Sequence, residues 1–255
     1  MTRINRLFSG FFIAAVLAMQ VWPLPASAAA GRYDQAIQEQ AVKILASKDK
    51  WKGITATTDD GIVTLDGSVK LYIDKVDAAK KVSKINHADG VRNHVQVEGN
   101  VPDAELQSKL SDKLSYDRIG YGIMFNALNL KVEDGVVTIG GDVRDYPSRD
   151  SAVAIVETTP GVKDVIDDIN VLPTSNFDDD LRIRVARAIY GQSSMTKYAM
   201  APEKPIRIIV DNGHVTLYGV VDSKMDRQLA ESQARSVSGA FSVDNKLVIA
   251  NQKER

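Results

Sequence analysis

A pattern of eight residues that occurs three times is the feature that most constrains the fold of this chain. Each copy begins with Asp-Gly or Asn-Gly, continues with alternating apolar residues, and has a second glycine six residues after the first. The copies occupy residues 60–67, 134–141 and 212–219. Asp-Gly and Asn-Gly are typical of type I′ turns, in which both central residues have positive φ. Each copy therefore predicts a hairpin turn followed by a strand.

The spacing of the three copies indicates separate small domains. Gly61 and Gly135 are 74 residues apart, and Gly135 and Gly213 are 78 residues apart. This period is longer than that of solenoid repeats and suits units that each bury a core of their own. A strand with alternating apolar residues precedes each turn, and another such strand ends each copy.

Helical periodicity flanks each hairpin. A first helix precedes it, and Asp34, Asp103 and Asp178 are expected to cap these three helices. A second helix follows it, with a small residue where it must lie close to a sheet; these residues are Ala78, Ala152 and Ala230. The second helices are expected near residues 75–85, 148–158 and 224–236.

The predicted fold class is α+β, with three tandem α-β-β-α-β domains. Each domain is expected to have a three-stranded mixed sheet with two helices on one face. The expected boundaries are 33–99, 103–172 and 177–250. The linkers between them are short, so we expect a compact or semi-rigid row of domains.

Nine glycines are expected to be structural residues of turns. They are Gly61, Gly67, Gly90, Gly135, Gly141, Gly161, Gly213, Gly219 and Gly239. In the first domain, a rigid offset of 74 residues from Gly161 leads to His87, three residues before Gly90. We expect a longer helix exit there, with Gly90 as the C-terminal cap.

The N-terminus has the features of an export signal. Two arginines precede an apolar run over residues 7–22, and Ala-Ser-Ala at 26–28 follows two prolines. This order predicts a signal peptide over residues 1–28, with cleavage after Ala28 or alternatively after Ala30. The apolar run is too short to favour a membrane anchor. We therefore expect a soluble periplasmic or secreted protein.

Composition narrows the classes of function. Of the 255 residues, 44% are apolar and 25% are charged, which is typical of a chain that buries a core. The 32 Lys and Arg residues against 33 Asp and Glu give a net charge of -1, which disfavours nucleic-acid binding. The absence of cysteine excludes disulfides and thiolate metal sites, and three histidines offer little for catalysis. We expect no enzyme activity, catalytic residue, metal, cofactor or small-molecule substrate.

The repeated pattern resembles the BON domain, a family named for bacterial osmotically induced and nodulation proteins. The second copy carries the resemblance most fully, at Gly135, Val137, Ile139, Gly141, Val143, Pro160, Gly161, Val162, Val165, Ile169 and Val171. The third copy matches at Gly213, Val215, Leu217, Gly219, Gly239, Val243 and Leu247. The resemblance implies a non-enzymatic protein of the bacterial envelope that binds phospholipid or another envelope surface. The alternative is a chaperone-like protein of osmotic stress that binds unfolded clients.

A candidate binding surface lies in the third domain. Helical periodicity places Ile183, Arg187 and Tyr190 outward, and arginines flank them. The following segment, residues 191–205, is expected to be a long loop. The candidate residues for binding anionic phospholipid or an envelope partner are Arg182, Ile183, Arg184, Arg187, Tyr190, Lys197 and Tyr198. The alternative is that these residues pack against the second domain.

Overall fold

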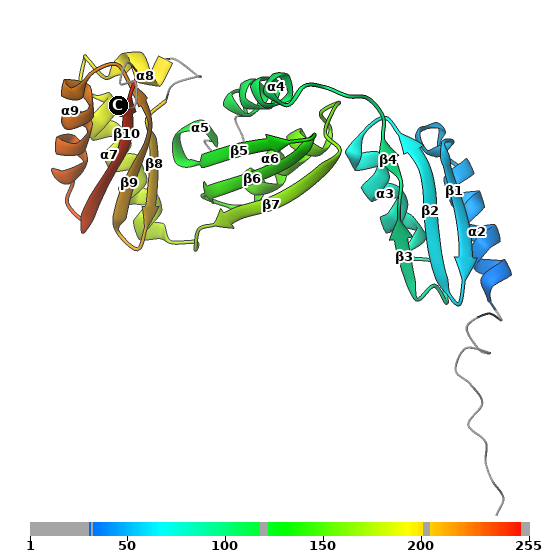
Figure 1. Ribbon diagram of the computed structural model, residues 1–255. Helices are drawn as coiled ribbons and strands as arrows, with labels where there is room; N and C mark the ends of the chain where they lie inside the picture. The colour runs from blue at the N-terminus through cyan, green and yellow to red at the C-terminus, as the bar shows by residue number, and fades with distance from the viewer. Residues whose placement is uncertain (1–30, 32, 118–121, 201–204, 251–255) are drawn as a thin grey trace, which may run out of the picture.

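Three small α+β domains follow one another along the chain (Figure 1). The computed structural model describes residues 31, 33–117, 122–200 and 205–250. The predicted signal peptide, residues 1–28, lies outside the described residues. Within the described ranges, no helix combines the length and the apolar character needed to cross a membrane.

The first domain contains a hairpin and a parallel return strand. Its elements are α2 (Asp34–Ala46), a short 3-10 helix (Asp49–Trp51), β1 (Ile54–Asp59), β2 (Ile62–Val69), α3 (Tyr72–Val82), β3 (Gly90–Asn93) and β4 (Gln96–Val97). β1 is antiparallel to β2, whereas β3 and β4 are both parallel to β2. Since β3 and β4 pair with successive parts of β2, they form one strand that is interrupted at His94 and Val95.

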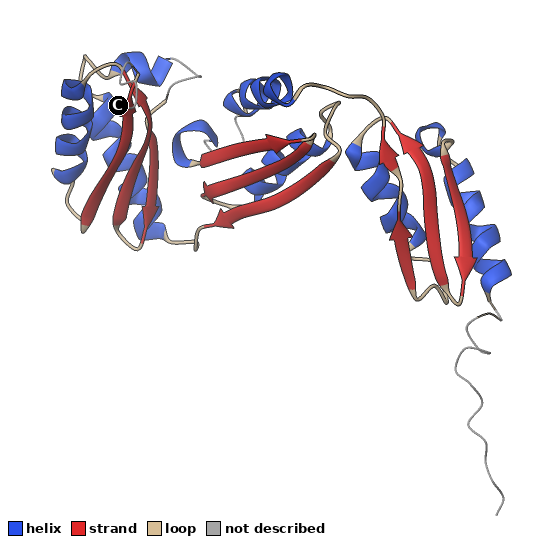
Figure 2. Cartoon of the chain, viewed as in Figure 1, coloured by secondary structure: helices blue, strands red, loops and turns tan. Residues whose placement is uncertain are grey.

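The second and third domains repeat this topology with additions. The second contains α4 (Asp103–Ser115), α5 (Gly122–Phe125), β5 (Ala127–Glu133), β6 (Val136–Val143), α6 (Tyr146–Glu157) and β7 (Asp164–Val171). The third contains α7 (Asn176–Tyr190), α8 (Thr196–Met200), β8 (Arg207–Asp211), β9 (His214–Val221), α9 (Lys224–Arg235) and β10 (Ser242–Ile249). Each sheet joins an antiparallel hairpin to a parallel strand, and helices cover one face of it (Figure 2). The predicted fold class is confirmed.

Each domain has its own apolar core between the sheet and its helices. The alternating residues of the central strands are buried, as expected; they are Val63, Leu65, Val137, Ile139, Val215 and Leu217. Ala78, Ala152 and Ala230 are also fully buried, where the second helix of each domain meets the sheet. A larger side chain at these positions would hold the helix away from the strands.

One aspartate in each domain ties the first helix to the hairpin turn. The Asp178 carboxylate accepts hydrogen bonds from the backbone N–H groups of Asn212 (3.0 Å) and Gly213 (2.8 Å). Asp103 accepts in the same way from Asp134 and Gly135, at 2.8 and 2.9 Å.

The prediction that these aspartates cap their own helices was therefore wrong. In α7 the capping residue is Ser175, whose side chain accepts from the N–H of Asp178. Helices α2 and α4 begin after Tyr33 and Pro102 without a side-chain cap. The carboxylates instead satisfy turn amides, because positive φ at both turn residues directs two adjacent N–H groups to one side.

Positive φ occurs at eight of the nine predicted glycines, from +76° at Gly61 to +128° at Gly219. Gly90 is the exception, because it begins β3 and its φ is not positive. His87 has the positive φ in the first domain, at +68°, so the rigid offset from Gly161 locates the turn and the prediction for Gly90 was wrong. The His87 ring stacks on Tyr33 with the ring centroids 4.1 Å apart.

Candidate binding surface of the third domain

Arg182 does not lie on the surface. Only 1% of it is exposed, and its guanidinium bonds to the backbone carbonyl of Val210 and to the Asp179 carboxylate. The predicted outward position was wrong because this side of α7 faces the edge strand β8. There the guanidinium satisfies a strand carbonyl.

Tyr190 and Tyr198 also turn inward, contrary to prediction. The Tyr190 hydroxyl donates to the carbonyl of Ile206 at 2.6 Å, and burial raises the pKa of this phenol. The Tyr198 hydroxyl donates to Asp226 at 2.7 Å and accepts from the N–H of Asp222 at 2.8 Å. The expected loop 191–205 contains helix α8, which carries Tyr198 into the core.

Lys197 is exposed, but its charge is already compensated. Its ammonium group lies 2.8 Å from the Asp222 carboxylate and 3.0 Å from that of Asp226. Hydrogen bonds to these two carboxylates raise the pKa of Lys197. The pairing weakens its role as a contact for an anionic surface.

An exposed surface remains on the outer side of α7 and extends to the hairpin end of the domain. We call it the basic-aromatic surface, and it consists of Phe177, Ile183, Arg184, Arg187 and Phe241. Exposure reaches 72% at Phe241, 47% at Phe177 and 38% at Ile183. The two phenylalanine rings stack with their centroids 6.1 Å apart. A Cβ at Gly239 would lie 3.2 Å from the Phe177 ring and 3.5 Å from a terminal nitrogen of Arg184, so these two side chains are neighbours.

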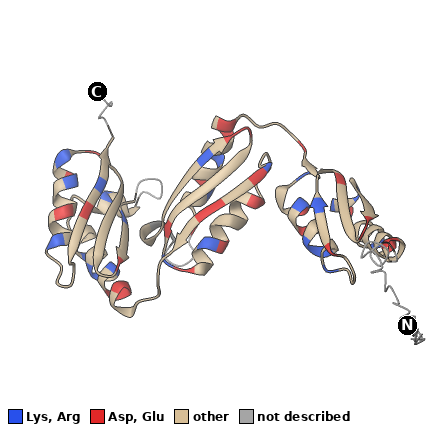
Figure 3. Cartoon of the chain, turned by 60° about the horizontal axis from the view of Figure 1, so that its bottom comes forward, with Lys and Arg blue, Asp and Glu red and all other residues tan. Residues whose placement is uncertain are grey.

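The two arginines of this surface differ in their partners. Arg184 pairs with Asp180 at 2.9 Å and donates to the carbonyl of Ser238. Arg187 is exposed and forms no ion pair with any described residue. Acidic and basic residues occur in all three domains (Figure 3), so the distinguishing feature here is the stacked pair of exposed phenylalanines next to the cations of α7.

The sequence interpretation missed Phe177 and Phe241, although the repeat held a signal for the second. In each domain the residue that begins the return to the sheet donates its N–H to the carbonyl of the turn glycine; these residues are Asp89, Lys163 and Phe241. A charged residue occupies this position in the first two copies, exposed at Asp89 and partly buried at Lys163. Phe241 replaces this charged residue in the third copy, and the replacement is the sequence signal for the basic-aromatic surface.

The other side of α7 contacts the second domain. Arg144 forms two hydrogen bonds with the Asp179 carboxylate, at 3.0 and 3.1 Å, and Asp179 also contacts Arg182. Phe125 of α5 belongs to the core of the third domain. Asp179 thus makes the contact of α7 with the second domain, whereas Arg182 bonds within its own domain, to Val210 and Asp179. The alternative of packing against the second domain therefore describes neither Arg182 nor the basic-aromatic surface.

We expect the contact between Arg144 and Asp179 to weaken in acid. A hydrogen bond from Arg144 lowers the pKa of Asp179 below its usual value, although burial opposes this effect. A lowered pKa stabilises the folded state above the usual aspartate pKa, and this contribution is lost as pH falls through the lowered value. Arg144→Gln should lower the free energy of unfolding by at most about 1 kcal/mol at pH 7. In urea titrations this difference from the parent should shrink towards zero below the usual aspartate pKa; a constant difference would contradict the assignment.

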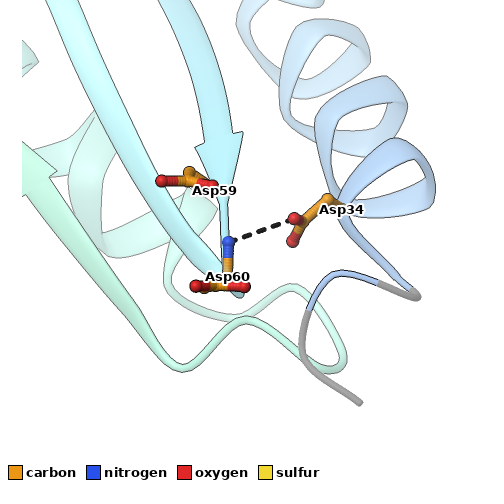
Figure 4. A group of neighbouring side chains, drawn as sticks. All are labelled: Asp34, Asp59 and Asp60. Carbon is orange, nitrogen blue, oxygen red and sulfur yellow. Dashed lines mark hydrogen bonds between the residues drawn. The ribbon is translucent and has the colours of Figure 1, made fainter. Parts of the chain in front are cut away.

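Asp34, Asp59 and Asp60 form the single group of three potential metal ligands among the described residues, with carboxylate oxygens within 4.8 Å of one another (Figure 4). Asp34 uses its carboxylate to accept from the N–H groups of Asp60 (3.0 Å) and Gly61 (2.9 Å). Asp59 and Asp60 are exposed. The tie between helix and turn accounts for this geometry.

Comparisons with known proteins agree with the repeat. The model of a family described as the BON domain matches residues 33–99, 102–173 and 192–251. The third match begins after α7, although α7 occupies the place that α2 and α4 have in the other domains. The chain is 27% identical over 128 residues to Osmotically-inducible protein Y of Escherichia coli (strain K12), which covers 47% of this chain and 60% of that protein. The chain thus spans about three fifths of that relative.

Two solved structures show weaker likeness. One is CdsD, a structural protein of the type III secretion system of Chlamydia trachomatis, with a TM-score of 0.24 and 15% identity over 84% of this chain and 91% of that one. The other is the periplasmic domain of the type III secretion protein PrgH from S. typhimurium, with a TM-score of 0.21 and 13% identity over 75% of this chain and 94% of that one. Likeness at this level carries no functional argument.

Proposed function

This chain belongs to the BON domain family, with three such domains in tandem, and we propose that it is a non-enzymatic protein of the bacterial envelope that binds anionic phospholipid surfaces. The observation that supports this most is the basic-aromatic surface of the third domain. It presents two exposed, stacked phenylalanines with Arg184 beside Phe177, and it continues along α7 to Arg187, which has no ion pair among the described residues.

The phenylalanines supply the apolar part of the proposed contact. Isolated exposed apolar residues are common on soluble proteins, whereas neighbouring ones indicate an interaction site. Phe177 and Phe241 project from two different segments to one end of the domain, and Ile183 continues the apolar surface along α7. Aromatic and branched apolar side chains suit the boundary between lipid headgroups and acyl chains.

Arg187 and Arg184 supply the electrostatic part. Cations near an anionic membrane surface contribute about 1 kcal/mol each, and the attraction decays within a Debye length. Because Asp180 partly offsets Arg184, Arg187 should contribute more. Binding should therefore require both anionic lipid and the phenylalanines.

Neither of the other two domains has a pair of exposed phenylalanines among its described residues. In the first domain Asp89 occupies the place of Phe241, and a carboxylate there would be repelled by an anionic membrane. In the second domain Lys163 occupies it, and its stem packs over Gly135. We propose that these domains act as spacers or as sites for other envelope partners.

Two further observations support a cellular location and a physiological condition for the proposed membrane binding. The predicted signal peptide over residues 1–28 would export the chain to the periplasm. The matched relative is named for osmotic induction, which supports a role during osmotic stress.

Vesicle co-sedimentation tests the proposal. We expect the protein to bind vesicles of mixed phosphatidylglycerol and phosphatidylcholine but not vesicles of pure phosphatidylcholine. The bound protein should dissociate as the salt concentration is raised. Phe177→Ser combined with Phe241→Ser should weaken binding at least tenfold, because the apolar contact is lost. Arg187→Gln should weaken it several-fold and reduce the salt dependence.

Met225→Ser is the matched control, since Met225 is 75% exposed and lies at the start of α9, at the opposite end of the domain. It should bind like the parent. Equal binding by the double phenylalanine variant would refute this surface as the contact. Parent protein that suppresses aggregation of unfolded clients but binds no vesicle would favour the chaperone-like alternative.

A further inference from the structure

Two adjoining clefts lie between the second and third domains, and Arg207 of β8 borders both. The smaller has a volume of about 150 Å³ and is lined by Gln107, Ser111, Leu114, Ser115, Asn126, Leu128, Leu130 and Arg207. The larger, of about 330 Å³, is lined mainly by β5, β6 and β9. By this measure one water needs roughly 10–15 Å³, so the smaller cleft has room for a small ligand.

Arg207 is a partly buried cation without a carboxylate partner. One of its terminal nitrogens donates to the backbone carbonyl of Leu128 at 3.3 Å, and no described carboxylate pairs with it. Burial alone lowers the pKa of this guanidinium. Nearby arginines differ in this respect, because Arg144 and Arg182 both contact Asp179. A guanidinium has five N–H donors, and most of those of Arg207 remain for a ligand.

Asn126 adds a second donor to the smaller cleft. It is only 5% exposed, and its Oδ1 accepts the backbone N–H of Arg144 at 2.8 Å. Because Oδ1 makes this bond, the NH₂ group of the amide remains as a donor, and no described residue accepts a hydrogen bond from it. Ser111, on α4, also lines the cleft and carries a hydroxyl group.

The smaller cleft is lined by no carboxylate, whereas the larger one includes Asp142. The side of Arg207 that faces α4 therefore offers a cation, an amide and hydroxyl groups to a ligand. This donor set matches an oxyanion, which accepts several hydrogen bonds and compensates a partly buried charge.

We propose that the cleft between α4, β5 and β8 binds a small oxyanion, a carboxylate or phosphate group, through Arg207, with Asn126 and Ser111 as additional donors. Both domains contribute to the site, so a bound anion links the edge strand of the third domain to the first helix and edge strand of the second. The site is separate from the basic-aromatic surface and does not depend on the proposed membrane binding.

Titration of the full mature chain followed by two-dimensional NMR tests this inference. Inorganic phosphate and acetate are the probes, with chloride at matched ionic strength as the reference. We expect saturable shifts of residues around Arg207 and Asn126 with phosphate, acetate or both, and none with chloride. Arg207→Gln should weaken binding at least tenfold, because the cation is lost.

Asn126→Asp is a sharper variant. It keeps the oxygen that accepts from Arg144 but replaces the NH₂ donor by a carboxylate beside Arg207, so it should abolish anion binding in a folded protein. Lys131→Gln is the matched control, because Lys131 is an exposed cation of β5 that lines neither cleft, and it should bind both probes like the parent. Undiminished binding by folded Arg207→Gln or Asn126→Asp, or no saturable binding by the parent, would overturn the proposal.

Vesicle binding by the same variants distinguishes the source of the oxyanion and separates this inference from the proposed function. If Arg207→Gln loses phosphate binding yet retains vesicle binding, the ligand is a soluble anion. If it loses both, the ligand includes a lipid headgroup. Loss of vesicle binding in Arg187→Gln alone would leave the oxyanion site intact.

Discussion

Gly141→Ala is expected to unfold the second domain. Gly141 has φ of +106°, a backbone conformation that residues with a side chain rarely adopt. A Cβ there would lie 2.0 Å from the carbonyl oxygen of Ala127 and 3.2 Å from the Cα of Leu128. Both contacts are with the backbone of the paired strand β5, so relief would require the hairpin to separate.

The cost should exceed about 4 kcal/mol, which is exceptional for one substitution. A domain of about 70 residues has roughly 4–10 kcal/mol of stability in total. We therefore expect hydrogen-exchange protection to be lost across the second domain while the first domain keeps its protection.

Gly135→Ala is the matched control six residues earlier. Its φ of +81° is closer to the left-handed helical region, and a Cβ would meet only the aliphatic carbons of Lys163, a flexible side chain, at 3.0–3.2 Å. The expected loss of stability is about 1 kcal/mol. Similar losses in the two variants would show that the close approach to β5 does not determine the need for Gly141.

Asp178→Ala is expected to destabilise the third domain by about 3 kcal/mol. The variant removes two charge-assisted hydrogen bonds to the turn, and the N–H of Gly213 that it leaves without an acceptor is buried. Hydrogen bonds to charged groups contribute about 1.5–3 kcal/mol each, and an unsatisfied buried N–H adds its own cost. Urea unfolding monitored by near-ultraviolet circular dichroism would measure the change.

Asp34→Ala provides the comparison within the same chain. It removes the equivalent pair of bonds, but the N–H of Asp60 is exposed and water can replace the carboxylate there. We expect a loss of about 1 kcal/mol. A loss at Asp178 no larger than at Asp34 would mean that burial of the turn does not determine the strength of the tie.

The periodic features of this fold were predictable from the sequence. Alternating apolar residues before and after Asp-Gly or Asn-Gly define both hairpin strands, because burial of one sheet face and the geometry of the turn specify the same strand register. The 74-residue offset between repeats correctly placed the turn residue with positive φ at His87. The prediction of this turn at Gly90, which relied on the preference of turns for glycine, was wrong. Three copies of one pattern make such a comparison stronger than any single motif.

The candidate site was harder to predict, because tertiary contacts decide which side of a helix is exposed. A helical projection places Arg182 beside the outward residues, but it contains no information about the edge strand whose carbonyl Arg182 binds. Tyr198 lies in a segment without clear periodicity, and its burial follows from core packing and from its bonds to Asp222 and Asp226. Arg207 alternates like any strand residue, and its cleft exists only where two domains meet.

The ties between helix and turn also bear on how a chain of three similar domains avoids exchanging strands. Tandem repeats risk pairing a segment of one copy with its counterpart in another. Each tie joins groups that are 26–35 residues apart, which is within one copy and less than half the repeat period. Closing such a short loop is fast and entropically favoured over reaching the neighbouring copy. We expect each helix to pair with its own hairpin during folding, so that segments of neighbouring domains are not exchanged.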